Sequence, residues 1–114
     1  IIDMRKLFFI LGMLLSLTSF SQISSSHISG VVRDTKGKKI NHAKVYIYYK
    51  SKGIGYGTYT DINGLFQFHY IETGGPYKLK VEHDSYLPYE KRDLEFELGD
   101  NYFDIIVEEK RNSN

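Results

Sequence analysis

About seven short segments of this chain alternate apolar and polar residues with the two-residue period of a β-strand. The clearest is AKVYIYYK, residues 43–50, which places Ala43, Val45 and Ile47 on one face and lysine and tyrosine on the other. Turn residues such as Gly, Asp and Asn separate the segments at intervals of roughly ten residues, and no long helical periodicity follows residue 22. The pattern predicts an all-β fold, a seven-stranded antiparallel Greek-key β-sandwich.

We expect the strands at residues 27–34, 43–50, 54–60, 65–71, 76–83, 86–98 and 102–109. Glycine thins the strand at 54–60, and Pro88 cannot donate to a hydrogen-bond ladder, so we expect both of these strands at sheet edges. The alternation places Tyr70 on the same face as Phe66 and Phe68. The expected core contains Val45, Ile47, Phe66, Phe68, Leu79, Val81 and Ile105.

The N-terminus has the layout of a secretory signal peptide. Arg5 and Lys6 precede the apolar run LFFILGMLL, and the small polar stretch SLTSFSQ puts Ser19 and Ser21 at the −3 and −1 positions of a cleavage site. The apolar run is much shorter than the ~20 residues of a spanning helix, so we expect no transmembrane span in the mature chain. Export would place the protein in the periplasm, at the outer membrane or outside the cell.

This layout divides the chain into four parts. We expect a signal peptide at residues 1–21, of which 1–3 come from an upstream start choice, a linker at 22–27, one domain at 28–109 and a polar tail at 110–114. The sequence contains no Cys, so an exported domain of this kind must be held together by its core alone.

The mature chain has a balanced charge. Loss of Asp3, Arg5 and Lys6 reduces the 15 basic and 14 acidic residues to 13 of each. A neutral chain has no net field to attract nucleic acid, so we expect no nucleic-acid partner.

The stretch TDINGLFQFHY, residues 60–70, admits two interpretations. Asp61 and Asn63 resemble the start of a calcium loop, but no further oxygen ligand follows until Glu72. A turn needs less, because Asp and Asn bond their own backbone and Gly64 supplies a positive φ without steric cost. We therefore expect Asp61, Asn63 and Gly64 to form a hairpin turn.

These segments together resemble the carboxypeptidase regulatory-like domain, a transthyretin-like (prealbumin-like) seven-stranded sandwich. The matching residues are Ile28, Gly30, Val32, Asp34 and Gly37, then Ala43, Val45 and Ile47, then Gly57, Thr58, Thr60, Asp61, Gly64, Phe66 and Phe68, then Tyr77, Leu79, Val81 and Tyr86, and finally Asp104 and Ile105. The sequence departs from the family pattern at Lys39 and Asn41, where proline is usual, at Ser85, where glycine is usual, and at Val107, where leucine is usual.

The resemblance implies an accessory role without catalysis. Domains of this family occur behind the signal peptide of TonB-dependent outer-membrane receptors and on exported peptidases, where they have a folding, docking or spacer role. It implies an envelope or outer-membrane protein as partner, and leaves open whether the module is free-standing or belongs to a receptor.

A hydrolase is the least favoured alternative. The transthyretin-like hydroxyisourate hydrolases end in a Tyr-Arg-Gly-Ser motif, whereas this sequence ends in EEKRNSN. His27, His42, His69 and His83 have no metal-site spacing, although hairpin pairing would bring His69 near His83 as an exposed pair. We therefore predict no catalytic, metal or cofactor residues.

Two modes of binding remain open. Six tyrosines form a candidate interaction surface, which would suit a protein or a glycan. Four of them have the outward phase or lie on the glycine-thinned strand, Tyr46, Tyr48, Tyr56 and Tyr59, and two flank Pro88, Tyr86 and Tyr89. The plainer interpretation is that these rings only cover the outer faces of a small domain. The other mode is the addition of a partner's strand to an edge, at residues 54–60 or 86–90.

Overall fold

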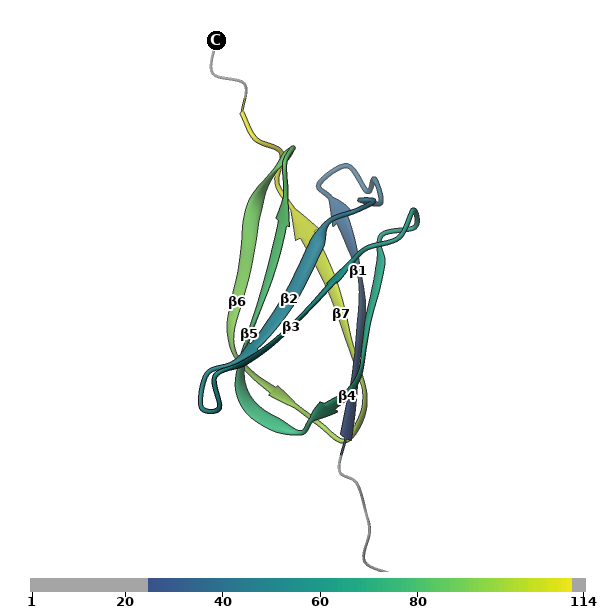
Figure 1. The fold of residues 1–114 in the computed structure, drawn as a ribbon. Helices are drawn as coiled ribbons and strands as arrows, with labels where there is room; N and C mark the ends of the chain where they lie inside the picture. The colour runs from purple at the N-terminus through teal and green to yellow at the C-terminus, as the bar shows by residue number, and fades with distance from the viewer. Residues whose placement is uncertain (1–24, 112–114) are drawn as a thin grey trace, which may run out of the picture.

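The computed structural model describes residues 25–111, which form two β-sheets packed face to face (Figure 1). The strands are β1 (Ser25–Asp34), β2 (Lys44–Tyr49), β3 (Ile54–Tyr59), β4 (Leu65–Glu72), β5 (Gly74–His83), β6 (Tyr86–Phe96) and β7 (Gly99–Val107). The predicted signal peptide lies outside the described residues, and residues 25–27, expected in a linker, already belong to β1. Among residues 25–111 there is no helix with the length and apolarity needed to cross a membrane.

The seven-stranded sandwich is confirmed, with strand orders β4-β1-β7 and β3-β2-β5-β6. One pair differs from the expected antiparallel arrangement, because β1 and β7 run parallel from Ser26↔Gly99 to Asp34↔Val107. These strands lie at opposite ends of the described chain, so no tight turn dictates their relative direction. The expectation that β3 and β6 are sheet edges is confirmed, and β4 and β7 are the edges of the other sheet.

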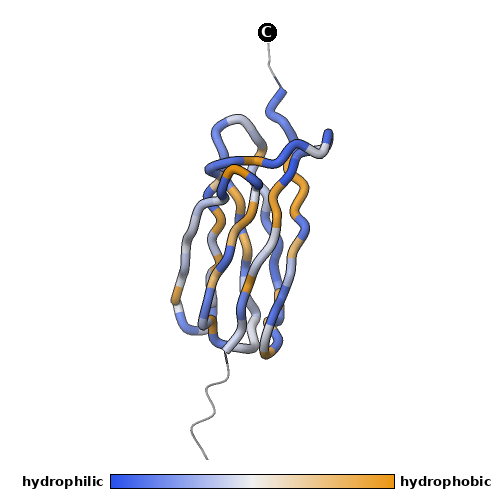
Figure 2. The backbone as a smooth tube through the Cα atoms, turned by 90° about the vertical axis from the view of Figure 1, so that its right-hand side faces the viewer, coloured by the Kyte–Doolittle hydropathy of each residue, from blue (hydrophilic) through white to orange (hydrophobic). Residues whose placement is uncertain are grey.

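The core lies between the sheets, and the side chains alternate toward and away from it. Figure 2 shows apolar and polar positions alternating along the strands. Cross-strand pairs such as Val45↔Val81 and Ile47↔Leu79 point inward together. All seven residues expected in the core are buried: Val45, Ile47, Phe66, Phe68, Leu79, Val81 and Ile105.

Tyr77 anchors one end of this core. Its ring lies 4.3 Å from the ring centroids of both Tyr49 and Phe96, and its hydroxyl donates to the carbonyl of Glu72 at 2.7 Å. Burial, together with the negative charge of Glu72, raises the pKa of Tyr77 to about 12.

The expectation that Tyr70 faces the core is wrong, because β4 contains a bulge. Ile28 pairs with Phe68, whereas Ser26 pairs with Ile71, so β4 has one extra residue in this interval. Tyr70 takes the left-handed conformation (φ 59°) and is 78% exposed. The bulge reverses the alternation, and Ile71 is buried in its place.

Candidate functional site

The turn after β3 is structural. The Asp61 Oδ1 atom accepts hydrogen bonds from the backbone N–H of Asn63 at 2.8 Å and of Leu65 at 3.0 Å, and the Gly64 N–H donates to the Asp61 carbonyl. Gly64 has the expected positive φ of 74°. The turn is not a hairpin, however, because β3 and β4 belong to different sheets and the chain crosses the sandwich here.

Tyr86 is a core residue, and its assignment to an exposed surface is wrong. Its side chain is buried, and its hydroxyl donates to Asp34 Oδ2 at 3.1 Å. Asp34 Oδ1 accepts from the backbone N–H groups of Lys36 and Lys38, both at 2.9 Å. The contact joins the β1 turn to β6, and the sequence alternation gave no sign of it because the two residues are far apart in the chain.

The pKa values of Asp34 and Tyr86 are shifted in opposite directions. Burial opposes the charge of Asp34, but the N–H groups of Lys38 and Lys36 and the Tyr86 hydroxyl outweigh it, so the pKa of Asp34 lies below its usual value. Burial, followed by the hydrogen bond to Asp34, raises the pKa of Tyr86. The pair therefore favours an ionised Asp34 and a neutral Tyr86.

The expected proximity of His69 and His83 is also wrong, since their strands lie in different sheets. His69 instead meets His27 across the β1–β4 pair, with 3.3 Å between the two Nδ1 atoms. His83 accepts a hydrogen bond from the Ser85 backbone, and its ring lies against Tyr86. Within residues 25–111 no group of three or more His, Asp or Glu side chains could hold a metal ion.

Tyr46 and Tyr48 do face outward from the four-stranded sheet, but lysines approach their rings. The ammonium groups of Lys44 and Lys80 lie 5.6 and 5.8 Å from the Tyr46 ring centroid, and the Tyr46 hydroxyl donates to Glu82 at 3.1 Å. These contacts are cation–π and hydrogen-bond interactions, so Tyr46 is a packed surface residue rather than a bare stacking platform.

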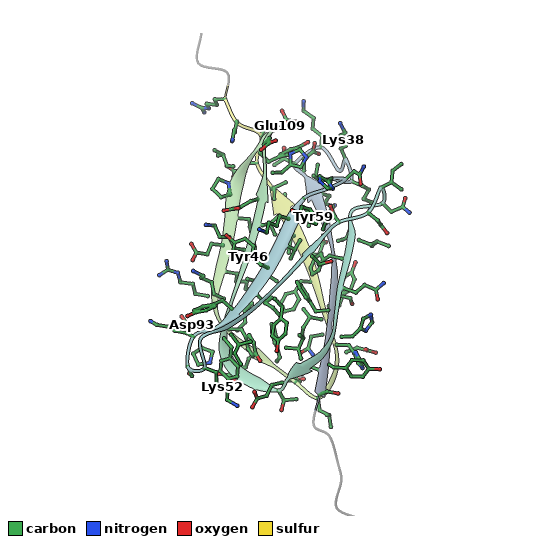
Figure 3. All side chains as sticks on the ribbon, in the orientation of Figure 1. Lys38, Tyr46, Lys52, Tyr59, Asp93 and Glu109 are labelled. Carbon is green, nitrogen blue, oxygen red and sulfur yellow. The ribbon has the colours of Figure 1, made fainter. Side chains whose placement is uncertain are left out.

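The remaining predicted tyrosines are divided between the two faces. Tyr59, labelled in Figure 3, pairs with Lys44 on the outer face and is 53% exposed. Its ring stacks on that of His42, with 4.5 Å between the ring centroids. Tyr56 pairs with the buried Ile47 and therefore has the inward phase, contrary to its place in an outward surface; it is 40% exposed only because β3 is an edge. Tyr89 is half-buried against the core.

The backbone of β3 has one unpaired side. Thr60 donates to the carbonyl of Ala43 and accepts from the N–H of His42, so both of its backbone groups point toward β2. Because this direction alternates along an antiparallel strand, residues 54, 56 and 58 bond to β2, whereas the N–H and C=O groups of residues 55, 57 and 59 point away from the sheet. Two of these three outward-facing residues are glycines, Gly55 and Gly57.

The edge of β3 also lacks the usual protection against strand pairing. Its sequence, IGYGTY, contains neither a charge nor proline, and its register with β2 has no bulge. By contrast, β4 contains the bulge at Tyr70, and β7 bears Asp100 and Asp104. Of the four edges, β3 is the one best suited to accept another strand.

The other predicted binding edge, residues 86–90, is covered at its start. The C-terminal segment lies along its start, where the Leu87 N–H donates to the Glu108 carbonyl at 2.7 Å and the Lys110 N–H donates to the Ser85 carbonyl at 3.3 Å. The chain therefore supplies its own cover for this end of β6. The residues that make this cover, Glu108 to Lys110, are all charged, so no hydrophobic pattern in the sequence marked them.

A shallow groove of about 480 Å³ runs over the outer face beside β3. Its floor is bare because Gly55 and Gly57 have no side chains to fill it. A Cβ atom at Gly55 would lie 3.7 Å from Tyr48 Cδ2, and one at Gly57 would lie 4.0 Å from Lys44 Cε. The charged residues that line the groove are Lys44 and Lys78, both basic.

Solved structures of low sequence identity share this fold. They include a protein from Bacteroides uniformis provisionally assigned to carbohydrate binding (18% identity, TM-score 0.61, covering 73% of this chain and 41% of that one). They also include hydroxyquinol 1,2-dioxygenase from Pseudomonas putida (7% identity, TM-score 0.65, covering 80% of this chain and 58% of that one). A third is catechol 1,2-dioxygenase from Acinetobacter radioresistens (12% identity, TM-score 0.64, covering 80% of this chain and 54% of that one). The chain spans about half the length of these proteins, and the likeness shows the fold alone.

Among curated proteins, none matches the sequence significantly. The family model of the carboxypeptidase regulatory-like domain matches residues 27–106, which include nearly all of the sandwich. The sandwich topology and the turn at Asp61 and Gly64 agree with this match, and the chain belongs to the carboxypeptidase regulatory-like domain family.

Proposed function

We propose that this protein is an exported, non-catalytic docking module of the bacterial envelope, and that β3 receives an extended segment of a partner envelope protein. The observation that carries the proposal is the open β3 edge, which is uncharged, unbulged and unpaired on one side. In strand addition the main chain supplies affinity and the side chains on the added strand supply specificity. No substrate chemistry is needed for this role.

The edge offers enough interactions for a specific but modest complex. Residues 55, 57 and 59 each present one donor and one acceptor, and each hydrogen bond formed contributes about 0.5–1.5 kcal/mol net. Two exposed apolar side chains of β3 itself, Ile54 and Tyr56, would add burial. The complex must also offset the ordering of the added segment, so we expect a reversible complex rather than a permanent one.

The docking role is tested by capture from the native envelope. The chain, expressed with its own leader and tagged after its last residue, is used to capture partners that are identified by mass spectrometry. Gly57→Lys places a charge on the free edge, and Tyr102→Lys places the same charge on an exposed position of β7 as a matched control. We expect one envelope protein to be captured by the unmodified chain and by Tyr102→Lys, and lost with Gly57→Lys; equal capture by both variants would refute docking at β3.

Export is tested separately. Cell fractionation should place the protein in the envelope or the medium, and N-terminal sequencing of the purified chain should begin at Gln22. An uncleaved chain found in the cytoplasm would contradict export and with it the proposed location in the envelope.

Carbohydrate binding is the second candidate. A cleft of about 510 Å³ at one end of the sandwich is lined by the stacked pair His42 and Tyr59 and by the polar side chains of Glu82, His83 and Asp84. Rings and carboxylates of this kind suit a sugar, and the Bacteroides uniformis protein with the same fold has been provisionally assigned that role. A glycan array with Tyr59→Ala as control separates the two candidates, because this variant removes the ring and leaves the β3 backbone in place.

A further inference from the structure

We infer that the segment received at β3 is an acidic peptide, with a carboxylate side chain opposite Gly57 and an aromatic side chain opposite Gly55. The inference rests on the proposed function, because it names the chemistry of the segment that docks at the same edge. It follows from what the groove beside β3 lacks and from the side chains that border it.

The two glycines leave room for side chains of an added strand. Gly57 lies opposite Tyr46 and Gly55 lies opposite Tyr48 on β2, so all four positions share the outer face. Neighbouring strands are about 4.8 Å apart, which puts an added strand about 10 Å from β2. Large side chains on that strand can lean across the glycines and reach the β2 side chains, as aromatic residues do when they cover glycines in sheets.

Opposite Gly57, the side chain that would be met is basic. The aliphatic end of Lys44 leans over Gly57, with Cε 4.0 Å from the position of a Cβ atom there. Lys78, the other charged residue of the groove, pairs with Glu90 at 3.5 Å, whereas the ion pairs formed within residues 25–111 do not include Lys44. Lys44 contacts the Tyr46 ring at 5.6 Å and lies across the ladder from Glu82, but no carboxylate of residues 25–111 is within ion-pair distance of its ammonium group. A carboxylate on the added strand would supply that ion pair.

Opposite Gly55, the side chain that would be met is aromatic. The Tyr48 ring edge lies 3.7 Å from the position of a Cβ atom on Gly55, and the ring is 38% exposed. An aromatic residue here would cover both the glycine and the ring, with the edge-to-face or offset geometry that such pairs prefer. The preferred segment therefore carries an acidic and an aromatic residue two positions apart, on one face of an extended strand.

A second copy of the chain fits this edge less well. Antiparallel pairing of β3 with itself about Gly57 would place Tyr59 of one copy opposite Gly55 of the other, which supplies the aromatic ring. It would also place Gly57 opposite Gly57, which leaves Lys44 of both copies without a carboxylate. The charge of the groove thus favours a foreign acidic segment.

The test uses two capped peptides, Thr-Phe-Thr-Glu-Thr-Phe-Thr and the same peptide with Lys in place of Glu. Both sequences are palindromic, so they present the same pattern in parallel and antiparallel pairing. We expect the Glu peptide to bind about ten-fold more tightly by calorimetry, and Lys44→Glu to reverse this preference toward the Lys peptide. Tyr102→Lys, on β7, should leave the preference unchanged.

Gly57→Pro identifies the mode of binding. The Gly57 N–H points away from β2, so proline removes no hydrogen bond of the sheet but blocks the free edge. We expect this variant to keep its circular dichroism spectrum and to lose both peptides. Retained binding would place the peptides elsewhere and overturn the inference.

The inference and the proposed function fail in different ways. Equal affinity for the two peptides, or binding of neither, overturns the acidic segment, while loss of the envelope partner with Gly57→Lys would still support docking at β3. Capture that is unaffected by Gly57→Lys overturns the docking role itself. A dimer in sedimentation velocity that Gly57→Pro dissociates would show that a second copy occupies the edge, and would also overturn the inference.

Discussion

Gly64→Ala should destabilise the domain strongly, because Gly64 combines a left-handed backbone with a close approach to β1. Its φ is 74°, and a Cβ atom would lie 2.5 Å from the Val32 carbonyl oxygen and 3.3 Å from the Ile40 nitrogen. The first distance is about 0.9 Å shorter than the 3.4 Å at which ordinary contact begins. The turn must therefore move away from β1, although the Val32 N–H donates to the Gly64 carbonyl at 2.8 Å.

Gly37 provides the matched control. Its φ is 87°, but a Cβ atom there would have no neighbour within 4 Å. Alanine in the left-handed region costs about 1–2 kcal/mol at either site, and the loss of unfolded-state entropy offsets about 0.4–1 kcal/mol of that cost. At Gly64 the overpacking adds about 1–3 kcal/mol, and weakening of the hydrogen bond from Val32 adds about 1 kcal/mol.

The expected difference between the two variants is therefore about 2–4 kcal/mol, with Gly64→Ala the less stable. Urea unfolding followed by circular dichroism measures it directly, and the corresponding fall in Tm is on the order of 10–25 °C for a domain of this size. If Gly64→Ala and Gly37→Ala lower the free energy of unfolding by the same amount within about 0.5 kcal/mol, the positive φ alone explains the destabilisation of both variants, and the proposed clash with β1 is wrong.

Four further variants test separate features. Tyr77→Phe should lower the free energy of unfolding by about 1 kcal/mol at neutral pH. The native chain should lose stability as the pH rises from 10 to about 12, because a tyrosine with a raised pKa favours folding only while it is protonated, and the variant should lack this loss. Thermal melts across that pH range check both expectations. Asp34→Asn should remove a loss of stability that begins as the pH falls below the ordinary aspartate value of 3.8, since the pKa of Asp34 is lowered on folding; acid titration by circular dichroism would show an unchanged profile if this is wrong. Tyr70→Gly should stabilise the domain by up to about 1 kcal/mol in urea, because it relieves the positive φ of an exposed residue, and a loss would indicate a packing role. Gly57→Val should raise the Tm yet weaken peptide binding, because valine suits a strand but fills the groove, and unchanged binding would contradict the groove's role.

Sequence periodicity predicted the fold well because most of its strands have one face in the core. A buried face penalises every slip of register by one residue, so the pattern in AKVYIYYK survives in the sheet, with Val45 and Ile47 buried. The turn at Asp61 and Gly64 was predictable for a local reason, since side-chain bonds to the backbone and a positive φ are properties of the residues themselves.

The errors arose where pairing partners determine the outcome. Tyr70 faces solvent because β4 gains a residue relative to β1, which depends on the register of two strands. Tyr86 is buried, and its hydroxyl donates a hydrogen bond to Asp34, which lies 52 positions away in the sequence. Tyr56 has the inward phase because Ile47 is its neighbour across the ladder. None of these relations is encoded in the alternation of a single strand.

The glycines of β3 link the fold to the proposed site. Gly55 and Gly57 weaken the strand, since each glycine in a strand costs roughly 0.5–1 kcal/mol relative to alanine, and their positions have room for a Cβ atom without any contact shorter than 3.7 Å. Neither glycine has the positive φ that makes glycine necessary at Gly64. Local propensity and packing would both favour a larger residue, and such conflicts concentrate at sites that serve function rather than stability. The edge is free because β3 is the last strand of its sheet, and the groove beside it is bare because of these two glycines, so a substitution at Gly57 should affect docking at the edge and recognition in the groove together.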